Sequence, residues 1–157
     1  MKKKADKSIR DNFGRVWPAH VSNLTELLIQ ARSAFDGDLD LFLVLAVIGD
    51  RSFAAGRVPP SFTFDDFMSE KNVKPEPLSV NAHSISQFSK IPRETVRRKV
   101  QELVDRGWVE RSEDGSLRAT RTAAVDLEPL TEASLSYLVR MAALFGNSET
   151  KSSHDSP

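Results

Sequence analysis

Four long polar side chains suited to hydrogen bonding with nucleobase edges stand close together in the sequence: Arg93, Glu94, Arg97 and Arg98. A guanidinium presents a planar pair of donors that matches the O6 and N7 acceptors of guanine, and a carboxylate accepts from the N4 amine of cytosine. Each such pair discriminates between bases by roughly 1 to 3 kcal/mol. The spacing therefore predicts a site that reads base pairs.

A second group of hydroxyl and basic side chains surrounds these four. Such groups bind backbone phosphates, which fix affinity and register without reading sequence. We predict phosphate contacts for Lys90, Thr95, Lys99, Arg111, Arg118 and Arg121. The charge distribution agrees, since residues 79–121 carry +3 and residues 1–20 carry +4, whereas residues 21–78 carry −4 and residues 122–157 carry −3.

A helix over residues 92–106 is predicted to carry the four base-reading side chains. Pro92 suits its start, where a missing amide proton costs nothing, and Gly107 suits the left-handed residue that closes it. Aliphatic residues recur at helical spacing along it and form one buried stripe, which turns the long polar side chains outward. The stripe consists of Val96, Val100, Leu103 and Val104.

A shorter helix is predicted in front of it, ending near Ser89. Asn81 is a suitable N-cap, and Val80 is placed to pack on Ile85 as a hydrophobic staple. Residues 89–91 then form the turn between the two helices.

Two short strands follow the longer helix. Residues 108–111 and 117–120 have strand character, and residues 113–115, Glu-Asp-Gly, are typical of a tight turn. The order of short helix, turn, long basic helix and hairpin predicts a winged helix-turn-helix over residues 79–121.

The six residues that begin at Arg93 read Arg-Glu-Thr-Val-Arg-Arg. They resemble the recognition-helix signature Arg-Glu-Thr-Val-x-Arg of the catabolite-activator and fumarate-nitrate regulator family, which are bacterial transcriptional regulators. The resemblance spans residues 81–120 and implies base contacts by Arg93, Glu94 and Arg98.

The chain also departs from that family. Pro92 stands where the family has a serine, and residues 1–78 lack a glycine-rich, cyclic-nucleotide-binding β-roll, so no cofactor is expected. Helices flanking the basic segment on both sides resemble the plan of small dimeric regulators of the multiple-antibiotic-resistance type. We also expect a homodimer because two copies can read successive major grooves about 34 Å apart, which gives more sequence specificity than one copy has.

The first 78 residues divide into a tail and a helical region. Residues 1–20 are lysine-rich, and Pro18 should end any helix there, so we predict a flexible basic tail. Residues 21–78 are predicted to form helices for the core or for dimerisation, the first capped by Asn23. A second helix from Asp38 is apolar on every side, so part of its surface is expected to meet a second subunit.

Three further segments complete the chain. Residues 62–68 hold a Phe and Met cluster that predicts a short helix, and a small-molecule sensor for an unknown effector is an alternative there. Residues 122–146 are predicted to form a C-terminal helix, with apolar positions at helical spacing. Residues 147–157 are predicted to be a disordered tail.

Several classes of function are not expected. The chain has no cysteine, which excludes disulfides and thiolate-bound zinc, and its three histidines are scattered, so no metal site is predicted. No phosphate-binding glycine loop, serine elbow or acid–base pair is present, so we do not expect an enzyme. The longest apolar run is far shorter than the roughly 20 residues of a membrane helix, and a cytoplasmic location is expected.

The sequence therefore predicts a mainly α-helical protein with a small β-hairpin, in which a winged helix-turn-helix is flanked by N- and C-terminal helices. The expected function is a transcriptional regulator that binds double-stranded DNA as a homodimer and reads the major groove with the helix at residues 92–106. The alternative is a winged-helix module for protein interaction or assembly that does not bind DNA.

Overall fold

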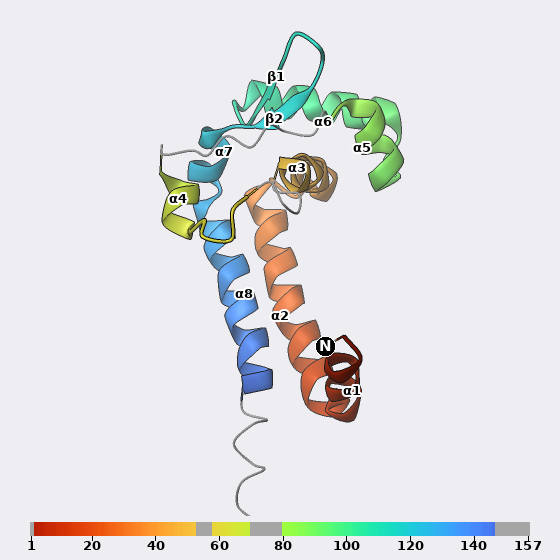
Figure 1. Cartoon of the computed structure of the whole chain (residues 1–157). Coiled ribbons are helices and arrows are strands. Elements are labelled where there is room, and N and C mark those ends of the chain that lie inside the picture. The colour runs from red at the N-terminus through yellow and green to blue at the C-terminus, as the bar shows by residue number, and fades with distance from the viewer. Residues whose placement is uncertain (1, 53–57, 70–79, 147–157) are drawn as a thin grey trace, which may run out of the picture. The chain divides into compact units, whose positions relative to one another are not determined.

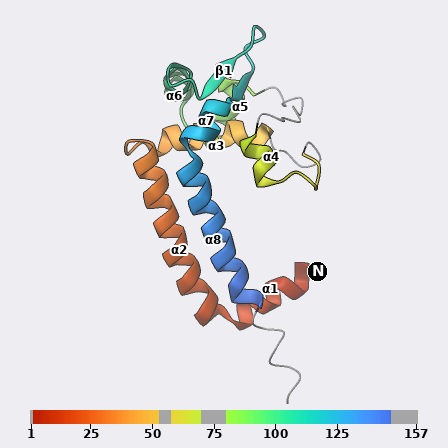
Figure 2. The same ribbon diagram turned by 90° about the vertical axis from the view of Figure 1, so that its left-hand side faces the viewer.

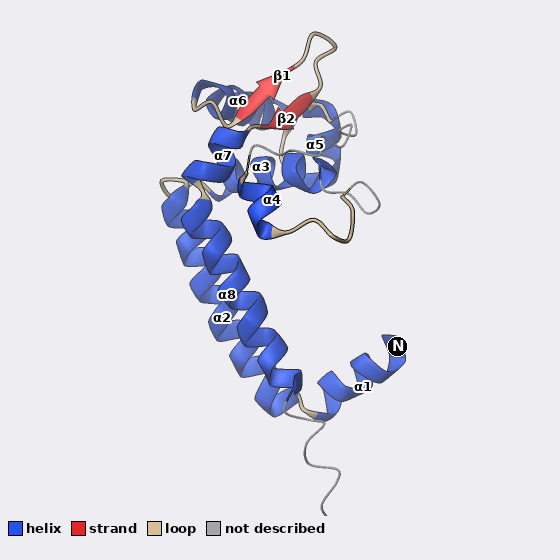
Figure 3. Ribbon diagram, turned by 60° about the vertical axis from the view of Figure 1, so that its left-hand side comes forward, coloured by secondary structure: helices blue, strands red, loops and turns tan. Residues whose placement is uncertain are grey.

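The computed structural model describes residues 2–52, 58–69 and 80–146. This part of the chain is mainly helical, with one small antiparallel sheet of two strands (Figure 3). It divides into a terminal unit, residues 1–31 with 129–157, and a central unit, residues 32–128. Within the described ranges, no helix combines the length and the hydropathy that crossing a bilayer requires.

Three helices of the central unit pack against one another: α3 (Leu39–Ser52), α5 (Ala82–Ser89) and α6 (Arg93–Asp105) (Figure 1). The hairpin of β1 (Val109–Arg111) and β2 (Leu117–Ala119) follows α6, and β2 also contacts α3. The predicted short helix, longer helix and hairpin are therefore confirmed as elements of secondary structure.

The core of the central unit is mainly aliphatic and draws on all of these elements. Its most deeply buried side chains are Phe35, Leu41, Val44, Ile48, Val80, Ile85, Val96, Val100, Leu103, Val109 and Leu117. The structure does not divide at the predicted domain boundary between residues 78 and 79, because α3 belongs to the same compact unit as α5 and α6. A short helix and a small hairpin cannot cover the apolar side of α6 alone, so α3 supplies the remaining cover.

The hairpin has a fixed register. Glu110 pairs with Arg118 across the two strands. Gly115 lies in the turn with φ of 80°, a left-handed conformation that favours glycine. The amide of Leu117 donates to the carbonyl of Val80 at 2.8 Å, so the residue before the α5 cap is joined to the hairpin.

Two small helices complete the central unit. The helix α4 (Phe64–Met68) begins with a capping box in which the Thr63 hydroxyl and the Asp66 carboxylate each accept from the other residue's backbone amide. It contacts α7 (Arg121–Asp126), which follows the cap residue Thr120. The prediction of a short helix in the Phe and Met cluster is confirmed.

The terminal unit is built from α1 (Lys2–Asp11), α2 (Phe13–Ala34) and α8 (Glu128–Gly146). The two long helices, α2 and α8, lie side by side (Figures 1 and 2). The single helix predicted over residues 122–146 is divided, because α7 ends before Leu127 and α8 begins at Glu128, but its predicted end near Gly146 is confirmed. The predicted tail at residues 147–157 lies outside the described residues.

The structure corrects two expectations about the N-terminal region. Pro18 lies inside α2 and does not end it. A proline in a helix costs about 3 kcal/mol, but the loss is confined to one turn, while the helix lets Val16 and Ala31 be buried. Asn23 is not a helix cap either, because it lies in the middle of α2 and its side-chain amide donates to the carbonyl of Ala19.

Candidate nucleic-acid interface

The predicted cap of α5 is confirmed. The side-chain oxygen of Asn81 accepts hydrogen bonds from the amides of His83 and Ser84, each at 3.0 Å, and the amide of Asn81 donates to the Ser84 hydroxyl. Both Val80 and Ile85 are buried, as the predicted staple requires. The start of α5 is therefore held by the capping box and by apolar packing together.

The turn between α5 and α6 is fixed by serine side chains. Lys90 adopts a left-handed conformation with φ of 63°. The Ser86 hydroxyl donates to the carbonyl of Ile91 at 2.7 Å, and the amide of Ile91 donates to the Ser89 hydroxyl at 3.2 Å. These bonds join α5 to the entrance of α6 and so set the direction in which α6 leaves the turn.

The helix α6 begins one residue later than predicted. Pro92 precedes its first residue in an extended conformation and provides no capping side chain, because a proline ring carries no hydrogen-bonding group. At the other end, Gly107 has φ of 72° and donates its amide to the carbonyl of Val104 at 2.9 Å. The predicted role of Gly107 in ending the helix is confirmed.

The four residues predicted to read bases are all exposed on α6. They reach solvent because the aliphatic stripe, and not the rest of the helix surface, is packed into the core. Arg97 donates to the carboxylate of Glu94 at 3.1 Å, and both side chains stay largely exposed. Within the described chain, Arg93 and Arg98 have no ion-pair partner.

The residues predicted to bind phosphate fall into different surroundings. Lys90, Arg111 and Arg121 are exposed and form no ion pair with a described residue. Arg118, in contrast, is paired with Glu110 on the neighbouring strand, which compensates its charge. Thr95 is half-buried.

Lys99 lies apart from these cations. Only 15% of its side chain is exposed, and its ammonium group pairs with Asp38, just before α3. Burial by itself would raise the pKa of Asp38, but the hydrogen bonds from Lys99 and from the Leu41 amide hold that pKa below the ordinary value of 3.8. Lys99 therefore connects α6 to α3, and we remove it from the proposed phosphate contacts.

The lowered pKa of Asp38 predicts how stability depends on pH. The folded protein binds the Asp38 proton less readily than the unfolded chain does. The stability that ionised Asp38 contributes to the fold is therefore complete above pH 3.8, and it is lost as the pH falls through the lower pKa of the folded state. We expect Asp38→Asn to lower the free energy of unfolding by about 1 to 2 kcal/mol at pH 7 and by much less at pH 2 to 3. Urea unfolding at both pH values measures the difference.

Asp40→Asn is the matched control, because Asp40 is exposed in the first turn of the same helix. We expect it to change the free energy of unfolding by less than about 0.5 kcal/mol at either pH. An Asp38→Asn effect of equal size at pH 7 and at pH 2 to 3 would contradict the assignment.

Sequence reasoning missed a further set of contacts behind α6. Arg106 donates to Asp36 at 3.1 Å and to Glu102 at 2.8 Å, and it also lies over the ring of Trp108. The indole nitrogen of Trp108 donates to Asp126 at 2.7 Å. The Glu102 contact has a local signal, the spacing of four residues, whereas Asp36 and Asp126 are far in the sequence from the residues they contact.

A hollow of about 310 Å³ lies between the first turn of α5, one side of α6 and the hairpin. Its cationic lining residues are Arg93, Arg97 and Arg111, with the imidazole of His83 beside them. We call it the arginine hollow. It brings together two predicted base-reading residues and one predicted phosphate-binding residue.

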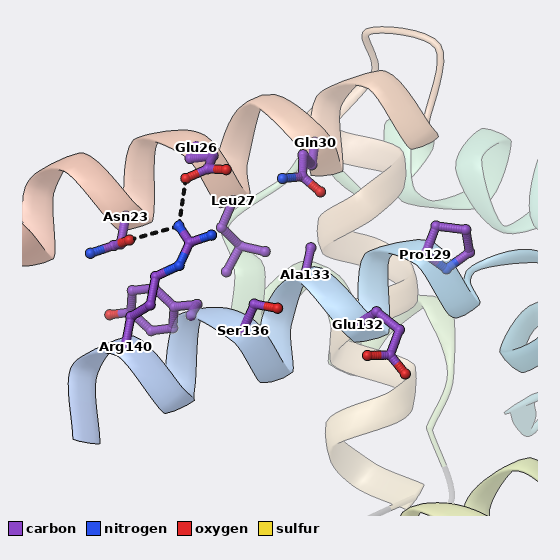
Figure 4. Close-up of a pocket in the computed structure, with 10 residues that line it drawn as sticks. Asn23, Glu26, Leu27, Gln30, Pro129, Glu132, Ala133, Ser136 and Arg140 are labelled. Carbon is purple, nitrogen blue, oxygen red and sulfur yellow. Dashed lines mark hydrogen bonds and ion pairs between the residues drawn. The ribbon is translucent and has the colours of Figure 1, made fainter. Parts of the chain in front are cut away.

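A second hollow, of about 190 Å³, lies between α2 and α8 in the terminal unit (Figure 4). The guanidinium of Arg140 reaches from α8 to the side-chain oxygen of Asn23 at 3.0 Å and to the carboxylate of Glu26 at 2.8 Å. Its arginine is thus already paired, and the contact it makes is a polar link between the two long helices.

Three side chains of types that can bind metals have structural partners. His20 hydrogen-bonds to the hydroxyl of Tyr137, Asp38 to Lys99, and Asp66 to Thr63. Over residues 2–52, 58–69 and 80–146, no three His, Asp or Glu side chains gather as metal ligands. No protein-family model, curated protein or solved structure matches this chain.

Proposed function

We propose that residues 79–121, which pack against α3, form a winged helix-turn-helix and that the protein is a bacterial transcriptional regulator that binds double-stranded DNA with sequence specificity. The observation that supports this most directly is the face of α6, where Arg93, Glu94, Arg97 and Arg98 are all exposed while the other side of the helix is packed into the core. A helix held in this way can enter the major groove without rearrangement.

The order of elements around α6 supports the same proposal. The short helix α5 and a fixed turn precede it, and a hairpin with the exposed cation Arg111 follows it. In the proposed complex, α6 lies in the major groove, and Lys90, Arg111 and Arg121 contact phosphates beside it.

Salt dependence of duplex binding tests the proposal. A protein that neutralises several phosphates releases counterions, so the logarithm of its affinity falls linearly with the logarithm of salt concentration, by about 0.9 per phosphate. We expect such a line from fluorescence anisotropy of a labelled duplex in roughly 50 to 200 mM salt. Absence of duplex binding at the lowest salt would instead favour the module for protein interaction.

We also propose that the protein binds DNA as a homodimer formed through α2 and α8. These two helices leave large apolar side chains exposed, among them Ile29 at 63%, Leu138 at 58% and Val139 at 68% exposure. On α8, Leu135, Leu138 and Val139 recur at helical spacing and form one stripe. A second copy offers the same stripe, as a two-fold symmetric interface requires.

Light scattering after gel filtration tests the homodimer. We expect the wild-type protein at twice the mass of one chain, and the double variant Leu138→Asp with Val139→Asp at the mass of one chain, because two carboxylates would have to be buried at the interface. Ala143→Asp, at an exposed position of the same helix outside the stripe, should leave the dimer intact. A wild-type protein at the mass of one chain would overturn the homodimer.

A further inference from the structure

The exposed residues of α6 lie on two different sides of the helix. Successive residues are turned by about 100° around the axis, so Glu94 and Arg98 lie opposite the buried stripe, while Arg93 and Arg97 lie beside it. The arginine hollow follows this division, since Arg93 and Arg97 line it and their neighbours Glu94 and Arg98 do not. The four predicted base-reading residues are therefore not equivalent.

The arginine hollow has a surplus of positive charge. Three guanidinium groups line it, and no carboxylate is found among the described residues of its lining. Arg97 donates to the carboxylate of Glu94 at 3.1 Å, whereas Arg93 and Arg111 have no ion-pair partner among the described residues, so the surplus charge lies mainly on these two. Like charges gathered around one space repel each other, and an anion bound among them would relieve that repulsion.

Other features of the arginine hollow also suit an oxyanion. Its lining includes His83 in the first turn of α5, where the helix dipole favours negative charge. The buried side chains of Val100 and Leu117 are part of the same lining, which gives the site an apolar backing. Guanidinium groups bind phosphate oxygens through two parallel hydrogen bonds, a geometry that the planar group favours.

We propose that the arginine hollow binds a phosphate group of the DNA backbone, with Arg93, Arg97 and Arg111 as its ligands. This inference rests on the proposed function and refines it, because it leaves Glu94 and Arg98 to read bases. The position of the hollow favours a backbone phosphate over a free one. On α6, the two arginines that line the hollow are each followed in the sequence by one of the outward residues, Glu94 or Arg98. A duplex that reaches Glu94 and Arg98 would thus bring its backbone to the hollow.

The test compares single variants on two DNA duplexes, one of the preferred sequence and one shuffled. We expect Arg93→Gln, Arg97→Gln and Arg111→Gln each to weaken both duplexes by the same factor, about two- to fivefold, as for an exposed ion pair. Each should also reduce the salt slope, by at most about 0.9, which is the whole contribution of the one phosphate that the three arginines share. Arg51→Gln, which removes a positive charge from the central unit outside the hollow, is the control and should leave the slope within about 0.3 of the wild-type value.

A second arm uses inorganic phosphate and needs no DNA. We expect saturable chemical-shift changes at the amides of Gly115 and Leu117 in the wild-type protein and none in Arg111→Gln. Phosphate saturation without any duplex binding would reject both DNA as the source of the phosphate and the proposed function. Normal duplex binding with unchanged salt slopes in all three variants would reject the phosphate site in the hollow but not the proposed function. If the Arg93 and Arg97 variants lost affinity only for the preferred duplex, these two arginines would be base-reading residues.

Discussion

Replacing Arg98 with alanine is expected to weaken binding to the preferred DNA sequence by about 5- to 150-fold, the range that corresponds to 1 to 3 kcal/mol of base discrimination. Arg98 is exposed on the outward side of α6, and no described residue pairs with it, so its guanidinium is available to a guanine edge. Binding to a shuffled duplex should change by less than about fivefold, because only a general electrostatic contribution is lost there. Selection of the preferred sequence from a random library, followed by anisotropy titrations, measures both affinities.

Arg121→Ala is the comparison for this experiment. Arg121 is also exposed and outside any ion pair with a described residue, but it begins α7 and lies outside the reading helix. It should weaken the preferred and the shuffled duplex by the same factor. Equal losses on both duplexes for Arg98→Ala would show that Arg98 binds phosphate.

Replacing Leu41 with alanine is expected to lower the free energy of unfolding of the central unit by about 2 to 5 kcal/mol. Leu41 lies in α3 and is completely buried, and α3 packs against α5, α6 and β2. Removing its side chain loses burial and leaves a cavity beneath the helix proposed to read DNA. Urea unfolding followed by far-ultraviolet circular dichroism measures the change.

Leu39→Ala provides the control on the same helix, because Leu39 is 39% exposed. We expect it to cost less than about 1 kcal/mol, since much of its surface already meets water. Equal destabilisation by the two variants would show that α3 contributes no specific packing to the core. If DNA binding weakens at lower urea concentrations in Leu41→Ala than in Leu39→Ala, the integrity of α3 is required for the interface.

The local elements around α6 were accessible from the sequence. Asn81, Gly107 and Gly115 carry signals that reside within a few residues, namely a capping side chain and two left-handed glycines. The aliphatic stripe of α6 repeats at helical spacing, so it predicted both the helix and its exposed side. In these places, local preference and tertiary packing require the same conformation.

Other features could not be predicted because they depend on partners far away in the sequence. Lys99 has a side chain that is suited to binding phosphate, yet it is paired with Asp38, which lies 61 positions away in the sequence. Glu110 compensates Arg118 only because the hairpin register places them opposite each other. Pro18 is tolerated in α2 because the rest of a long helix keeps its hydrogen bonds, which a local rule does not take into account.

The two tryptophans offer a spectroscopic consequence of this organisation. Trp17 lies in the terminal unit and is half exposed, whereas Trp108 lies in the central unit and is buried beside Phe35. A shielded indole emits at shorter wavelength than a hydrated one, so each unit carries its own optical reporter. With phenylalanine in place of Trp17, the remaining emission would follow the melting of the central unit alone, without any attached dye.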